Sequence, residues 1–228
     1  MLCDLDNAAL EITAAACPGA AGIMTESLDV TDDAKVAGLL TRAHERFGRI
    51  DVIVTAAGIA RSGWLDEMAP ELWRRIVEVN LFGTYSFARP GGELLAENGG
   101  AFVALASDAG LRGAGKYTAY SASKHAVVGL VRSMALEYGH RGVRANAVCP
   151  SFVETPMAEA LLKDVSEAQR QAYRDGNPTG RFARPEEVAS AIAALVSPAM
   201  SYVNGTALSV DGGLTAGSYP GKRNMEQV

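Results

Sequence analysis

The amino-acid sequence predicts an α/β fold with a mostly parallel sheet that is covered by helices on both faces. Short apolar, β-branched runs alternate with longer amphipathic stretches, which is the pattern of βαβ units. The runs are almost continuously apolar, as in parallel strands buried on both sides. With 228 residues and no repeat or linker, the sequence indicates one domain over residues 1–228.

Four runs are expected to be strands, and turn-forming residues follow most of them. The first ends at Gly58, the third at Pro150, and the fourth just before Asp211. They span residues 50–55, 101–106, 143–148 and 207–210.

Helices are expected between these strands. Thr31 is the expected cap of a helix over residues 32–47 that ends at Gly48, and Pro185 opens another. Two long helices are expected over residues 70–87 and 120–138. Residues 154–184 form a polar insertion of helical character, and residues 214–228 form a tail expected to be poorly ordered unless something docks it.

Composition and charge exclude several classes of function. The net charge of −5 argues against nucleic acid or an anionic membrane as the main partner. The N-terminus lacks the features of a secretory signal, and the apolar stretch 189–200 is too short to span a membrane. Cys3, Cys17 and Cys149 have no metal-ligand spacing. The sequence therefore indicates a cytoplasmic protein without a metal site.

Three residues form a pattern that suggests proton chemistry. Tyr120 and Lys124 are one helical turn apart, so the lysine cation can lower the pKa of the phenol toward the working range. Ser107 directly follows an expected strand, at the sheet edge where ligands of parallel sheets bind. In isolation, a tyrosine and a lysine at this spacing are more often a surface pair, and a serine at a strand end is more often a turn residue.

Together with other segments, this pattern resembles the short-chain dehydrogenase/reductase family. The hallmark YxxxK with its upstream serine is present, and the similarity extends over nearly the whole chain. The other matching segments are Thr55-Ala56-Ala57-Gly58, Val79-Asn80-Leu81-Phe82-Gly83, Cys149-Pro150-Ser151 with Thr155, Asp29-Val30, and Val210-Asp211-Gly212-Gly213. Asparagines usual in the first segment and a glycine usual after Pro150 are replaced here.

The resemblance implies a Rossmann-type, doubly wound sheet and a nicotinamide-dependent oxidoreductase of secondary alcohols or ketones. It implies that Tyr120 is the general acid/base, that Lys124 lowers its pKa, that Ser107 polarises the carbonyl, and that Asn80 supports a proton relay. It also implies a homo-oligomer, a tetramer or dimer, built through helices 70–87 and 120–138. The cofactor-binding positions that it implies are Asp4, Leu5, Asp29, Val30, Ala56, Ala57, Gly58, Tyr120, Lys124, Pro150, Val153 and Thr155.

The preferred cofactor depends on the residues at the N-terminus. If residues 1–3 end a strand, Asp4 can accept hydrogen bonds from the adenosine ribose and repel a 2′-phosphate. No Arg or Lys follows closely, so NAD is favoured and NADP is less expected. The alternative is that Asp4 or Asp6 only caps the helix that follows.

One departure from the family concerns its first strand, TGxxxGxG loop and first helix, which nothing in the sequence matches. The chain is expected to begin inside the second strand, which makes the fold N-terminally truncated and leaves a gap in the strand order 3-2-1-4-5-6. A mis-assigned start, a fragment and a shortened, inactive product are the alternatives. A catalytically silent binding or scaffold protein is accordingly the second hypothesis for function.

In the family, the insertion forms a lid over the substrate. Its cationic side chains are more often a solvated helix face, although they could suit an anionic group on the substrate. They are Lys163, Arg170, Arg174 and Arg181.

Overall fold

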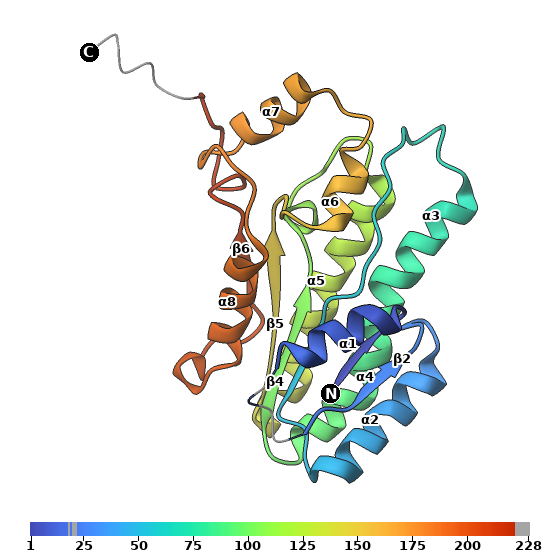
Figure 1. The fold of residues 1–228 in the computed structure, drawn as a ribbon. Helices are drawn as coiled ribbons and strands as arrows, with labels where there is room; N and C mark the ends of the chain where they lie inside the picture. The colour runs from blue at the N-terminus through green and yellow to red at the C-terminus, as the bar shows by residue number, and fades with distance from the viewer. Residues whose placement is uncertain (18, 20–21, 222–228) are drawn as a thin grey trace.

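The computed structural model describes residues 1–17, 19 and 22–221, and within them all the strands run parallel (Figure 1). Two strands pair in one sheet and four in another, in the orders β1-β2 and β3-β4-β5-β6. The strands are β1 (Leu2–Asp4), β2 (Thr25–Ser27), β3 (Val52–Thr55), β4 (Gly100–Leu105), β5 (Val143–Pro150) and β6 (Ala207–Val210). This is the predicted Rossmann-type parallel arrangement.

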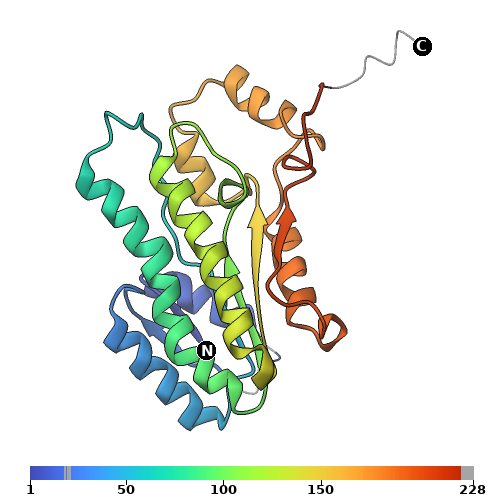
Figure 2. The ribbon, with the colours of Figure 1, turned by 180° about the vertical axis from the view of Figure 1, so that it is seen from behind.

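Helices pack on both faces of the four-stranded sheet. Figure 2 shows α5 lying along the face opposite α8, and both helices contact β4 or β5. The α-helices are α1 (Asn7–Ala15), α2 (Asp33–Phe47), α3 (Pro70–Val77), α4 (Gly83–Ala96), α5 (Thr118–Tyr138), α6 (Pro156–Leu161), α7 (Glu167–Asp175) and α8 (Pro185–Val196).

The core divides along β4 because successive side chains of a strand point to opposite faces. Phe102 is fully buried in the larger cluster, with α2, α4 and α5. Val103, the next residue, is fully buried in a smaller cluster with Val188 and Leu195 of α8. A strand with both faces covered explains the continuous apolar run at residues 101–106.

The structure corrects three details of the expected elements. Asp32, not Thr31, caps α2, because its carboxylate accepts a hydrogen bond from the backbone N–H of Lys35. The expected helix over residues 70–87 is divided by a π-helical turn at Glu78–Phe82 and continues to Ala96. Strand β5 extends through Pro150, which is its last residue.

The chain contains an additional short strand, β2, that the sequence pattern did not indicate. It has only three residues and no fully buried side chain, so its apolar signal is weak. It pairs in parallel with β1, and Cys3 lies opposite Glu26.

The two sheets are separated by a gap between β1 and β3, which no strand of the described residues fills. Val52 and Val54 of β3 are 42% and 43% exposed. The two parts meet through the packing of α2 on α4 and of Val30 on Gly83. A Cβ on Gly83 would lie 2.5 Å from Cγ2 of Val30, so this close approach requires glycine.

The insertion contains α6 and α7, which lie beyond the carboxyl end of β5 (Figure 1). Turns follow β6 over residues 211–217, and the last part of the expected tail, residues 222–228, lies outside the described residues. In the part of the chain that is described, no helix combines the length and hydropathy of a membrane span.

Candidate active site

Ser107, Tyr120 and Lys124 lie together at the carboxyl end of β4. The Ser107 side chain acts directly on the Tyr120 hydroxyl and lowers the pKa of this phenol, and Lys124 Nζ lies 5.6 Å from the centroid of the Tyr120 ring. Lys124 Nζ also donates a 2.7 Å hydrogen bond to the carbonyl oxygen of Leu105, the last residue of β4. The strand end and helix α5 therefore bring together the three residues that the sequence singled out.

Burial sets the charge states of this group. It raises the pKa of Tyr120 to about 12, although the nearby Ser107 side chain opposes the change. It lowers the pKa of Lys124 to about 8, because desolvation penalises the ammonium ion. At neutral pH, Tyr120 is therefore a neutral phenol that can donate a proton, and most Lys124 side chains are cations.

Asn80 is fully buried in the π-helical turn, and its side chain makes three hydrogen bonds. Its Oδ1 accepts from the N–H of Ile59 at 2.8 Å, and its Nδ2 donates to Ile59 O and Ser123 Oγ, both at 3.0 Å. Asn80 therefore fixes the loop after β3 against helix α5. Its contact on that helix is Ser123, the residue before Lys124.

The acidic residues at the N-terminus occupy two different positions. Asp6 caps α1 by accepting hydrogen bonds from the N–H groups of Ala8 and Ala9. Asp4 ends β1 and is exposed, as is Leu5 after it. Asp4 accepts one backbone hydrogen bond, from Asp6 at 3.0 Å. Most of its carboxylate is therefore available to a ligand.

Asp29 and Val30 lie in the loop after β2, and both are half-buried. Asp29 accepts hydrogen bonds from the N–H and hydroxyl of Thr31 and from Arg75. These bonds lower the pKa of Asp29 to about 2, so its carboxylate is ionised at neutral pH.

The loop after β3 presents small residues at the same sheet edge. Ala56 and Ala57 are exposed, while a Cβ on Gly58 would lie 3.1 Å from Asn80 Oδ1 and 3.6 Å from Lys124 Nζ. The backbone at Gly58 thus passes close to the catalytic candidates. The hydroxyl of Thr55 is buried and bonds to no described residue.

The segment after β5 completes this edge. Ser107 Oγ lies 3.5 Å from the carbonyl oxygen of Pro150, which places Pro150 beside the catalytic candidates. Val153 is half-buried. Thr155 caps α6 by accepting a hydrogen bond from Ala158 N–H.

A nicotinamide cofactor fits the residues at this edge. The exposed Asp4 carboxylate can accept hydrogen bonds from ribose hydroxyls, and the ionised Asp29 carboxylate can accept one from an amine. The Thr55 hydroxyl has no partner among the described residues, so it can bond to a ligand. The small side chains of Ala56 and Ala57 leave space for the cofactor. The described residues supply no glycine-rich loop for a pyrophosphate. They also contain no cluster of His, Cys, Asp and Glu side chains that could hold a metal ion.

Sequence reasoning missed several residues of this region. Asp108 accepts a 2.9 Å hydrogen bond from Ser107 and pairs with Arg112, a contact that the i, i+4 spacing could have indicated. The side chain of Ser62 acts on the Tyr117 hydroxyl and lowers its pKa, and Arg75 bonds to Asp29. The last two contacts join distant segments, so no local pattern signals them.

The lid cations that could have suited an anionic group are mostly paired with acids. Arg170 contacts Glu159 at 3.1 Å, Arg174 contacts Glu167 at 2.8 Å, and Arg181 contacts Glu187 at 2.7 Å. These three arginines therefore have acidic partners within the chain, which disfavours an anion site.

Comparisons with known proteins match this arrangement. Residues 1–215 match the family model described as Enoyl-(Acyl carrier protein) reductase. The chain is 43% identical over 190 residues to cis-4-hydroxycyclohexanecarboxylate dehydrogenase of Sinomonas cyclohexanicum, which covers 82% of this chain and 75% of that protein. The crystal structure of levodione reductase superposes with a TM-score of 0.90 at 34% identity, over 94% of this chain and 87% of the other.

One of the similar proteins is named as an inactive enzyme. The inactive 2-(S)-hydroxypropyl-CoM dehydrogenase 2 of Xanthobacter autotrophicus is 39% identical over 219 residues, which are 94% of this chain and 94% of that protein. The family model, these relatives and the superposed structure agree on one family. The chain belongs to the short-chain dehydrogenase/reductases, oxidoreductases that act on alcohols and ketones with a nicotinamide cofactor.

Proposed function

We propose that this chain is an NAD-dependent oxidoreductase that interconverts a secondary alcohol and its ketone, with Tyr120 as general acid/base. One observation carries the proposal: the Tyr120 phenol, the Ser107 hydroxyl and the Lys124 ammonium group lie together at the carboxyl end of β4. Proton transfer by a positioned group of this kind contributes about 10²–10⁴-fold to a rate.

Each protein group has a separate task in this mechanism. The bound cofactor supplies or accepts the hydride. Tyr120 donates its phenolic proton to the carbonyl oxygen during reduction and takes it back during oxidation. Ser107 donates a hydrogen bond to the same substrate oxygen, while the Lys124 cation favours the tyrosinate. Asn80 holds the loop after β3 so that these groups keep their positions.

A panel of cyclic and open-chain secondary alcohols, assayed with NAD by the absorbance of NADH, tests the proposal. Turnover of at least one member by the purified chain is expected. Because one relative is named for cis-4-hydroxycyclohexanecarboxylate, cyclic alcohols come first in the panel. The ring of Phe152 packs against those of Tyr173 and Phe182 in the lid, with a centroid distance of 5.4 Å in each pair.

We expect alcohol oxidation to accelerate as the pH rises from 6 to 7.5, a range in which most Lys124 side chains keep the charge that favours the Tyr120 phenolate. Oxidation needs the Tyr120 phenolate, whose fraction grows about tenfold per pH unit below a pKa of about 12. Ketone reduction needs the phenol, which predominates over this whole range, so its rate should not rise with pH. Initial rates in both directions check this expectation, and an oxidation rate that stays flat or falls would contradict the assignment of the base.

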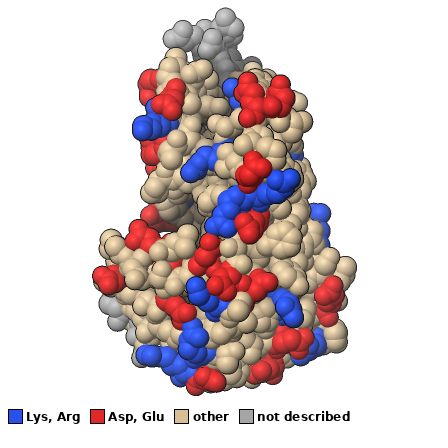
Figure 3. Space-filling model, turned by 90° about the vertical axis from the view of Figure 1, so that its right-hand side faces the viewer, with Lys and Arg blue, Asp and Glu red and all other residues tan. Residues whose placement is uncertain are grey.

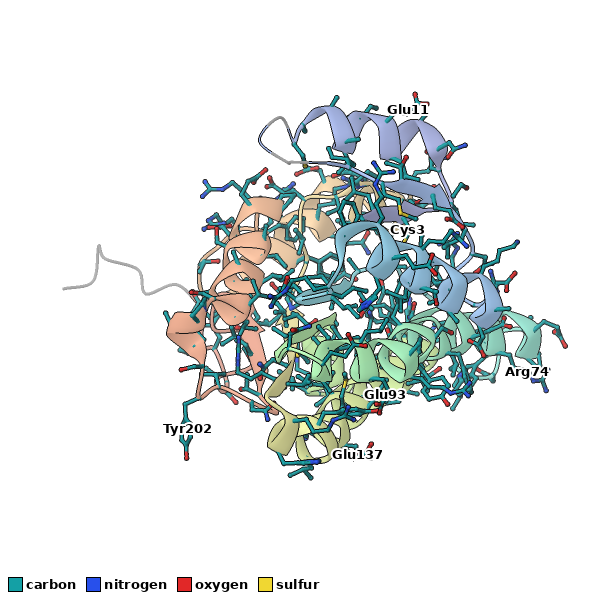
Figure 4. All side chains as sticks on the ribbon, turned by 90° about the horizontal axis from the view of Figure 1, so that it is seen from below. Cys3, Glu11, Arg74, Glu93, Glu137 and Tyr202 are labelled. Atoms are coloured by element: carbon teal, nitrogen blue, oxygen red, sulfur yellow. The ribbon has the colours of Figure 1, made fainter. Side chains whose placement is uncertain are left out.

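We expect Asp4→Ser to raise the KM for NAD about tenfold and to reduce the preference for NAD over NADP. The reason is that a charged hydrogen-bond acceptor for the ribose is lost. Glu11→Gln is the matched control, since Glu11 points outward from α1 (Figure 4). Steady-state KM values for both cofactors provide the measurement. An unchanged preference in the Asp4 variant would remove Asp4 from the cofactor site.

We also propose a homo-oligomer. An open groove of about 450 Å³ is lined by residues of α2, α4 and α5, among them Ala37, Tyr85, Pro90 and Tyr138. Acidic and basic side chains are interspersed over the face shown in Figure 3, which suits a small-molecule enzyme better than a nucleic-acid partner. Sedimentation as a clean monomer at assay concentration would contradict the oligomer.

A catalytically silent binding protein is the second candidate. The gap between β1 and β3 favours it, as does the similarity to a relative of comparable coverage that is named inactive. A chain that binds NADH but fails to turn over any member of the alcohol panel would support this candidate over the enzyme.

A further inference from the structure

Arg75, on helix α3, reaches across to the loop that follows β2. Its Nη2 donates to Asp29 Oδ2 at 2.8 Å, and its Nη1 contacts Thr31 Oγ1 at 3.4 Å. The same guanidinium also bonds to Glu78 at 3.0 Å. The side chain thus contacts three groups, two of them in a segment more than forty positions away in the sequence.

These contacts fix the orientation of the Asp29 carboxylate. Oδ1 accepts hydrogen bonds from both the N–H and the hydroxyl of Thr31, at 2.9 and 2.8 Å. Oδ2 accepts from Arg75. A carboxylate can accept roughly four hydrogen bonds, so Oδ2 keeps a free position whose direction Arg75 and Thr31 determine.

The contact also joins the two parts of the fold. No strand of the described residues pairs β1 with β3, so strand pairing does not fix the loop after β2 relative to the catalytic groups. Helix α3 leads directly into the π-helical turn that carries Asn80. The Arg75–Asp29 pair therefore connects that loop to the helix that supports the candidate active site.

We propose that Arg75 is a positioning residue for cofactor binding: it orients the carboxylate of Asp29 so that the free position of Oδ2 accepts a hydrogen bond from the adenine amino group. This inference rests on the proposed function, because it concerns the adenine end of the same cofactor. Arg75 need not touch the cofactor, since its effect passes through Asp29.

An exposed ion pair alone contributes little to the stability of a protein. The chain contains such a pair, which serves for comparison. Arg74, the preceding residue, lies 3.6 Å from Glu71, and both side chains are largely exposed. It extends away from the outer end of α3 (Figure 4). Arg74→Gln therefore removes the same charge from the same helix without affecting Asp29.

The test compares Arg75→Gln, Arg75→Lys and Arg74→Gln with the wild-type chain, using calorimetric titration with AMP and with NADH. Arg75→Gln is expected to weaken both ligands about tenfold, the value of a hydrogen bond to a charged group, while Arg74→Gln binds as wild type. Arg75→Lys should recover part of the affinity, because it keeps the charge without the planar fork. The KM for NAD should rise in Arg75→Gln while kcat stays unchanged.

Several results would overturn the inference. Wild-type affinity for AMP in Arg75→Gln would show that Asp29 needs no positioning. A fall in the thermal midpoint together with kcat would show a structural role instead. If the wild-type chain binds AMP but turns over no alcohol, the proposed function fails while the inference stands. If it binds neither AMP nor NADH, both fail.

Discussion

Tyr120→Phe is expected to lower kcat by about 10³-fold or more, while NADH binding and the thermal midpoint stay close to those of the wild type. The substitution removes a single oxygen, which is the proton donor of the proposed reaction. Because the ring remains, its packing beside Lys124 is retained, so the loss should appear in kcat rather than in folding. Steady-state kinetics and cofactor titration on the same preparation check both parts.

Tyr202→Phe is the matched control for this experiment. Tyr202 is fully exposed and projects from the surface in Figure 4, so removal of its hydroxyl should leave kcat unchanged. Comparable turnover in the Tyr120 and Tyr202 variants would exclude Tyr120 as the acid/base and would leave the family membership unaffected.

Asn80→Ala is expected to lower the free energy of unfolding by about 2–4 kcal/mol, because it leaves the backbone N–H and carbonyl of Ile59 without their partners. For a chain of this size, that change corresponds to a fall in the thermal midpoint of roughly 5–15 °C. Activity should also fall, since Asn80 fixes the loop that passes beside Lys124. Thermal unfolding and kcat at a temperature where both proteins are folded provide the measurements.

Asn7→Ala is the corresponding control, because Asn7 is an exposed residue at the start of α1. A thermal midpoint of the Asn80 variant equal to that of the Asn7 variant would contradict the structural part of this account. Loss of activity without loss of stability would instead indicate a direct role of Asn80 in proton transfer.

The sequence predicts the parts of the fold whose signals are local. The β-branched run at Val52–Thr55 and the glycine at Gly48 each act through their own backbone preferences, and both are found where expected. Strand β2 was not predicted because three residues without a buried side chain leave little apolar pattern. The π-helical turn also went unpredicted, since it depends on how Asn80 packs against a distant loop.

In the candidate site, too, the features with local signals are predictable from the sequence, and those that depend on tertiary packing are not. The spacing of Tyr120 and Lys124 is a helical property, and the position of Ser107 follows from the end of a strand, so sequence alone brings these residues near one another. The charge states are not visible in the sequence, because the pKa of Tyr120 is raised by burial that only the folded chain creates. The link between Arg75 and Asp29 likewise depends on tertiary packing.

Titration of the chain with NADH and, separately, with NADPH is the most direct test of the central claim, that residues 1–228 form a working NAD site beside Tyr120. Nicotinamide fluorescence should show saturable binding of NADH with a dissociation constant at least about tenfold lower than that of NADPH, as the exposed Asp4 carboxylate requires. Binding of neither cofactor, or tighter binding of NADPH, would contradict the account.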